Sequence, residues 1–140
     1  MPRQEFKFVL DKISAAKLRT IKRKKVSPTA LKGTWVNCDK NTRGLVKVVI
    51  GSRGGVLSVN AFGACVPRPC NWGRVKGLAY ADNVASVDGV AFSAMYKFSF
   101  KDVIMVGHLC CGCMLIETYN HFTDGSGRSD YYSQGCFYRA

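Results

Sequence analysis

In residues 90–101, apolar side chains alternate with small or charged ones, and this pattern constrains the fold more than any other feature of the chain. Apolar side chains occupy every second position from Val90 to Phe100, and mostly small or charged residues lie between them. Successive side chains of an extended strand point to opposite faces, so this period of two predicts a half-buried β-strand. We expect one strand over 90–101, with its aromatic rings on the face opposite Lys97 and Lys101.

Short β-type segments also follow one another through the rest of residues 34–140. Clusters of Gly, Asn, Asp and Ser separate them, and the connections are too short for crossover helices, which predicts an antiparallel meander. About eight strands are expected, the number at which such a sheet can close into a barrel without a free edge. The fold class is therefore all-β, with further strands expected at 34–38, 44–51, 55–64, 74–82, 103–109, 113–123 and 130–139.

The formal charge of +12 is unevenly distributed over the 140 residues. Residues 1–33 carry ten basic and two acidic side chains, which amounts to two thirds of the excess. Apolar residues recur at helical spacing from Phe6 to Ala16, and Ser27 and Pro28 would end a helix. We expect an amphipathic helix over about 3–24, within a basic arm at 1–32 that precedes a barrel domain at 33–140.

Three roles are open for this arm. It could pack on the barrel, bind nucleic acid phosphates, or lie on an anionic membrane surface as a docking or targeting segment through residues 1–25. Asp11 and Lys12 interrupt the apolar run that a secretory signal needs, so we expect a cytoplasmic or organellar protein that is not secreted. The candidate contacts are Lys17, Arg19, Lys22, Arg23, Lys24 and Lys25.

Gly33-Thr34-Trp35 opens the first expected strand, and Arg139 lies in the last one. This arrangement resembles the calycin superfamily of lipocalins, fatty-acid-binding proteins and avidins. The resemblance implies that the late arginine packs across the tryptophan, and that a central cavity holds a small apolar or amphipathic molecule. The candidate ligand-binding positions are Trp35, Phe62, Trp72, Phe92, Tyr96, Phe98 and Met114.

The seven cysteines fall into separate groups. Cys65 and Cys70 bracket a Pro-x-Pro loop and are close enough in sequence for a disulfide, although an odd total and the lack of a secretory signal favour mostly reduced thiols. Residues 108–113 contain one His and three Cys, but on an extended strand these point to both faces, so we expect small buried side chains and no metal site.

Residues 121–132 form the most polar expected loop and contain His, Asp, Ser and Arg. These residue types also occur in hydrolase sites, but catalytic triads draw their members from separated elements. We expect a hairpin turn in which Arg128 pairs with Asp124 or Asp130. The leading hypothesis is a non-enzymatic, cofactor-free barrel that binds a small hydrophobic molecule or partner; a nucleic-acid-associated protein and a hydrolase are the alternatives.

Overall fold

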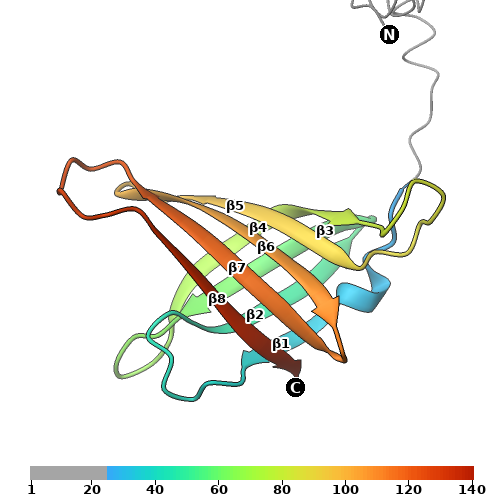
Figure 1. Cartoon of the computed structure of the whole chain (residues 1–140), viewed down its shortest axis with the longest axis horizontal. Coiled ribbons are helices and arrows are strands. Elements are labelled where there is room, and N and C mark those ends of the chain that lie inside the picture. Colours follow the sequence, from blue (N-terminus) through green and yellow to red (C-terminus); the bar gives the residue numbers. More distant parts are fainter. Residues whose placement is uncertain (1–24) are drawn as a thin grey trace, which may run out of the picture.

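The computed structural model describes residues 25–140, and these form eight strands after a single 3₁₀ turn, η1 (Thr29–Leu31) (Figure 1). No helix within this part of the chain is long and apolar enough to cross a bilayer. The amphipathic helix expected at 3–24 lies outside the described residues. The strands are β1 (Gly33–Asn37), β2 (Leu45–Arg53), β3 (Val56–Gly63), β4 (Cys70–Tyr80), β5 (Ala91–Lys97), β6 (Lys101–Cys110), β7 (Cys113–Phe122) and β8 (Tyr131–Arg139).

The strands form one closed barrel in chain order, as the meander pattern predicts. Every strand pairs antiparallel with the next, and β8 returns to pair with β1. This closing ladder is the shortest, with three cross-strand pairs from Trp35 with Arg139 to Asn37 with Phe137, whereas β6 and β7 share ten. Closure satisfies the backbone groups that an open edge would expose.

Alternating residues of each strand fill the barrel interior. On β6, for example, Val103 and Met105 are fully buried between more exposed neighbours. One position is kept small by close packing: a Cβ on Gly107 would lie 2.3 Å from the ring of Phe92. The core consists of Leu31, Trp35, Leu45, Val48, Ile50, Leu57, Val59, Ala61, Phe92, Ala94, Tyr96, Val103, Met105, Met114, Ile116 and Phe137.

The strand expected over 90–101 is two strands. β5 ends at Lys97, and the Phe98 N–H donates to the Lys101 carbonyl at 2.8 Å, which closes a tight hairpin. Inserting a turn changes which positions face inward, so Lys101 points into the barrel and is only 8% exposed. The expectation that Lys101 lies on the face opposite the rings is therefore wrong, because the alternation on each side of the turn belongs to a different strand.

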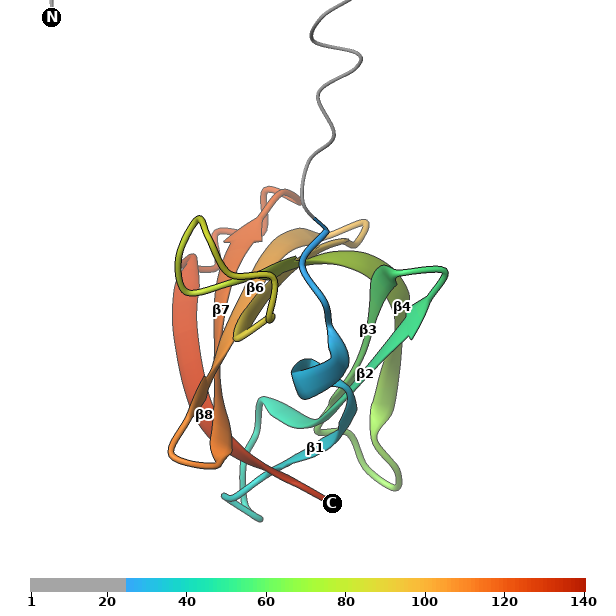
Figure 2. The same ribbon diagram turned by 90° about the vertical axis from the view of Figure 1, so that its right-hand side faces the viewer.

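One end of the barrel is covered by η1, which lies across the opening in Figure 2. The indole N–H of Trp35 donates to the Leu31 carbonyl at 2.9 Å, and Leu31 is completely buried. Arg139 packs its guanidinium 4.6 Å from the Trp35 ring and donates to the Ala30 carbonyl at 2.6 Å. This is the packing of a late arginine across an early tryptophan that the calycin resemblance implies, and it closes this end.

Candidate functional site

The opposite end of the barrel holds a cavity of about 450 Å³. We call it the mouth cavity. The β1–β2 and β3–β4 loops contribute to its rim, and inward-facing residues of β2, β4, β6, β7 and β8 form its walls. Its volume falls in the range of pockets that hold small molecules. The lining residues are Arg43, Gly44, Leu45, Gly63, Ala64, Cys65, Cys70, Trp72, Lys101, Thr118, Asn120, Tyr131 and Ser133.

Three aromatic rings pack together next to this cavity. Trp72 meets Tyr96 and Phe98 edge to face, with ring centroids 5.4 and 5.3 Å away. Tyr96 and Phe98 stack on each other at 5.7 Å with an angle of 8° between their planes. These geometries are the favourable ones for aromatic pairs. The cluster gives the mouth a rigid apolar side, to which Trp72 contributes directly.

The Tyr96 hydroxyl is held deep in the barrel by backbone groups. The β3–β4 ladder is irregular between Asn60 and Phe62, and the Ala61 N–H donates to the Tyr96 oxygen at 3.0 Å. That oxygen in turn donates to the Gly73 carbonyl at 2.8 Å. Burial raises the pKa of Tyr96 above its usual 10.0, so the phenol stays neutral. Tyr96 thus provides hydrogen bonds to backbone groups where the ladder is irregular, which is a structural role.

Lys101 is the buried charge of the mouth cavity. Its ammonium donates to Asn120 Oδ1 at 3.0 Å, and the Asn120 amide is oriented in turn by donating to Thr118 Oγ1 at 3.1 Å. Aromatic rings surround the ammonium, with Trp72 at 5.2 Å and Tyr131 at 5.7 Å from Nζ. Among residues 25–140, Lys101 forms no ion pair, and no carboxylate lines the cavity.

The surroundings of Lys101 disfavour its charged form. Burial lowers the pKa of Lys101 below its ordinary value, and the positive charge of Arg128 lowers it further. Arg43 adds another positive charge to the rim. Because an ammonium has three N–H donors and Asn120 accepts only one, the site retains donor capacity and an unbalanced positive charge. An anionic group is the chemical complement of such a site.

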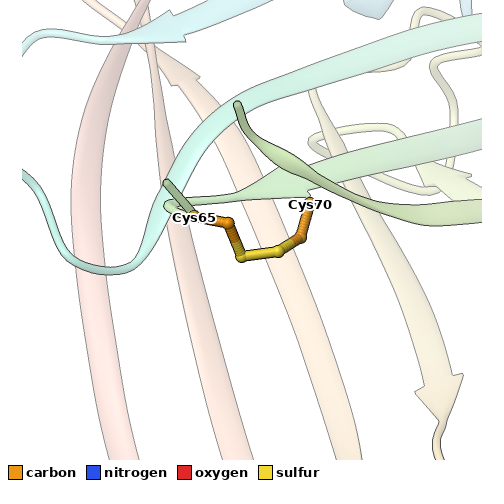
Figure 3. The surroundings of a disulfide bond; sticks show 2 residues. All are labelled: Cys65 and Cys70. Atoms are coloured by element: carbon orange, nitrogen blue, oxygen red, sulfur yellow. A yellow bond between two sulfur atoms is a disulfide. The ribbon is translucent and has the colours of Figure 1, made fainter. Parts of the chain in front are cut away.

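A disulfide joins Cys65 to Cys70 at the rim, as their spacing suggests (Figure 3). It ties together the ends of the β3–β4 loop, and both cysteines line the mouth cavity. The neighbouring Gly63 lies against the Trp72 ring, where an added Cβ would come within 2.9 Å of the indole nitrogen. The disulfide and this close contact hold the rim next to the aromatic cluster.

The seven ligand-binding positions expected from the sequence are divided among three places. Trp72, Tyr96 and Phe98 form the aromatic cluster, and only Trp72 lines the mouth cavity. The side chains of Trp35, Phe92 and Met114 are fully buried in the core. Phe62 points outward, because the inward positions of β3 are its alternate residues, and its ring packs 4.3 Å from the Lys47 ammonium.

Of the six expected phosphate contacts in the arm, five lie outside the described residues. Lys17, Arg19, Lys22, Arg23 and Lys24 precede the first described residue, whereas Lys25 is described and exposed.

The polar loop between β7 and β8 is a hairpin turn held by local bonds. Asp124 accepts from the Ser126 N–H and pairs with Arg128 at 2.7 Å. Of the two partners expected for Arg128, the structure therefore has Asp124 and not Asp130. His121 bonds Asp130 through Nδ1 at 2.6 Å, and within residues 25–140 the His121 side chain has no other hydrogen-bond partner. The His–Asp pair therefore has no serine positioned beside it in this part of the chain.

The remaining cysteines lie on the outside of the barrel, and the expectation of buried side chains at 108–113 is wrong, because Cys110 and Cys111 are exposed. Cys110 and Cys113 face each other across the β6–β7 turn, rather than pointing to opposite faces as expected. Cys136 contacts the thiols of Cys113 and Cys38, and burial followed by these hydrogen bonds raises its pKa to about 11. A thiol with such a pKa is a poor nucleophile at neutral pH. No cluster in the described part of the chain has the geometry of a metal site.

Lys101, Asn120 and Thr118 are site residues that the sequence-based expectations do not include. One signal was present: counting back in steps of two from the apolar positions Met105 and Val103 places Lys101 on the same inward face. No known protein supplies a guide to these residues, because no family model, curated protein or solved structure matches the chain.

Proposed function

We propose that this protein is a calycin-like, non-enzymatic binding protein that holds a small amphipathic molecule in the mouth cavity. The apolar part of the ligand lies against Trp72 and Leu45. Its anionic group, a carboxylate or a similar small anion, accepts hydrogen bonds from Lys101. The fold is compatible with such a role, and the chemistry of the mouth cavity favours it.

The observation that carries this proposal is the unbalanced charge of Lys101. A buried cation normally has a carboxylate partner, because its desolvation is otherwise costly. Here the ammonium faces a cavity with one amide oxygen and aromatic rings as its neighbours. A bound anion would complete the hydrogen bonding and offset the burial that depresses the pKa of Lys101.

The space available supports a compact ligand. The core side chains near η1 are closely packed, so the cavity ends partway down the barrel. A smaller hollow of about 100 Å³ shares Leu45, Thr118 and Ser133 with the mouth cavity and continues toward Ile116 and Phe137. A short apolar tail fits this extension while the anionic group stays near Lys101.

Binding of octanoate and 1-octanol, measured by calorimetry with the full chain, tests the proposal. The two probes share a chain length, but octanoate carries a carboxylate and 1-octanol a neutral hydroxyl. We expect octanoate to bind at least about tenfold more tightly, which corresponds to about 1.4 kcal/mol. Lys101→Met should remove this preference, because methionine keeps much of the volume and loses the charge. Lys47→Met is the matched control, since Lys47 lies on the outer face over Phe62.

Three results would contradict the proposal. The first is that neither probe binds the wild-type protein. The second is that Lys101→Met, shown to be folded by circular dichroism, keeps the full preference for octanoate. The third is that Lys47→Met loses the preference equally, which would show that overall charge, rather than the mouth cavity, attracts the anion.

A further inference from the structure

A hollow lies on the outer surface of the barrel, across strands β5 to β8. It measures about 690 Å³ and is lined by apolar and charged side chains arranged in two rows. The apolar row runs straight across the sheet, because Met95 is paired with Ile104, Ile104 with Tyr119, and Tyr119 with Tyr132. All four are large side chains that are 45–51% exposed. A contiguous apolar surface of this kind typically marks an interaction site.

The charged row borders the apolar row on the side nearer the mouth. Lys97 pairs in register with Asp102, and Asp102 with His121. His121 is bonded to Asp130, which immediately precedes β8. Basic and acidic side chains therefore alternate from β5 to the beginning of β8. On a chain with a formal charge of +12, this face has no excess of positive charge, so a second copy can approach it without strong repulsion.

The order of the charges makes the face complementary to itself. Consider a twofold axis that lies in the interface, runs along the strands and passes between β6 and β7. This axis brings Lys97 opposite Asp130 of the second copy, and Asp102 opposite its His121. The apolar row also meets itself, with Met95 opposite Tyr132 and Ile104 opposite Tyr119. Every charged side chain of the row then meets one of opposite or neutral character, as an isologous interface requires.

We propose that this face, formed by the apolar row and the charged row, is the dimer interface of the protein, and that its occupant is a second copy of the same chain. Burying the apolar row drives association, and the charged row sets the orientation of the two barrels. No side chain of the two rows lines the mouth cavity, although Asn120 and Tyr131 border both hollows, so this inference does not rest on the proposed ligand.

Sedimentation equilibrium of the full chain, from about 1 to about 200 μM, tests the proposal. We expect the mass to rise toward twice 15.4 kDa. Ile104→Glu should give a monomer, because it puts a charge at the centre of the apolar row. Tyr138→Glu is the matched control: Tyr138 is 46% exposed on the outer face of β8 but lies outside both rows, so this variant should still dimerise.

A charge exchange within one chain gives a sharper test of the orientation. The double variant Lys97→Asp/Asp102→Lys keeps the net charge and the cross-strand pair within each barrel. It nevertheless puts a carboxylate opposite Asp130 of the second copy and an ammonium opposite its His121. We expect the dimer dissociation constant to rise at least about tenfold. A wild-type monomer at every concentration, or a dimer that survives both Ile104→Glu and the exchange, would overturn the proposal.

Discussion

The two ends of this barrel use aromatic residues in different ways. At the end covered by η1, Trp35 is 1% exposed. Its indole N–H donates to the Leu31 carbonyl, and its ring face packs against the Arg139 guanidinium. At the mouth, Trp72 is only partly buried and borders a cavity that contains the Lys101 ammonium, which forms no ion pair within residues 25–140. The first end is closely packed and closed, whereas the second includes the energetic cost of burying the Lys101 ammonium. Such a local cost is typical of a surface kept for binding.

Truncating the two tryptophans should separate these roles most strongly. Trp35→Ala removes a fully buried ring and the hydrogen bond to Leu31, and we expect it to lower the free energy of unfolding by about 3–5 kcal/mol. Trp72→Ala should cost about half as much, because its ring is already partly open to solvent. Urea unfolding at pH 7 measures both values. Equal losses at the two ends would show that the mouth is as important for stability as the closed end.

Replacing the buried ammonium should have an intermediate effect of opposite sign. Lys101→Met removes a desolvated charge, and we expect it to raise the free energy of unfolding by about 1 kcal/mol at pH 7. The pKa of Lys101 is lower in the folded chain than in the unfolded one, so between these two values the unfolded chain binds more protons. Wild-type stability therefore rises with pH in that window.

The difference between Lys101→Met and the wild type should accordingly shrink as the pH rises through the lowered pKa of Lys101 toward 10.5. Urea unfolding at pH 7, 8, 9 and 10 follows this change, with Lys47→Met as the control on the outer face. A Lys101→Met variant that is less stable than the wild type at pH 7 would mean that the ammonium stabilises the mouth.

The His121–Asp130 pair at the mouth end should have the smallest effect. The hydrogen bond and charge of Asp130 raise the pKa of His121 above 6.5. Its contribution to stability is therefore fully present below 6.5, the unfolded-state value, and is lost as the pH rises through the folded-state pKa. Because both side chains are exposed, we expect a small effect on stability and a clear effect on titration.

Proton NMR of the histidine ring measures this titration directly. In Asp130→Asn, the pKa of His121 should fall back toward 6.5. In Asp124→Asn it should be nearly unchanged, because Asp124 pairs with Arg128 instead. A His121 pKa that stays high in Asp130→Asn would assign the shift to another group, such as Asp102, whose charge also raises it.

Most of the fold could be predicted because its strands are regular. Residues 113–123 were expected as a strand, and β7 spans Cys113–Phe122. The alternation there reflects direct burial of one face, which is a local property. The number and order of strands then led to a closed meander.

The mouth could not be predicted in the same way because it depends on turns and on contacts between distant strands. The hairpin at 98–100 contains no Gly, Asn or Asp to mark it, so the alternation on its two sides predicts one continuous strand. Without that turn, the expected orientation of Lys101 is the reverse of the one it has. The pairing of Lys101 with Asn120 depends on the register of β6 and β7, which alternation alone does not determine.

The short seam between β1 and β8 also constrains how the chain reaches its fold. Seven of the eight ladders join strands that are neighbours in sequence, and each can form as a local hairpin. The seam instead joins the two ends of the barrel domain, and the bond from Arg139 to Ala30 spans 109 residues. Loop closure over such a distance is slow. We therefore expect the hairpins to assemble first and the seam to form last, so that the transition state for folding resembles an open, curled sheet.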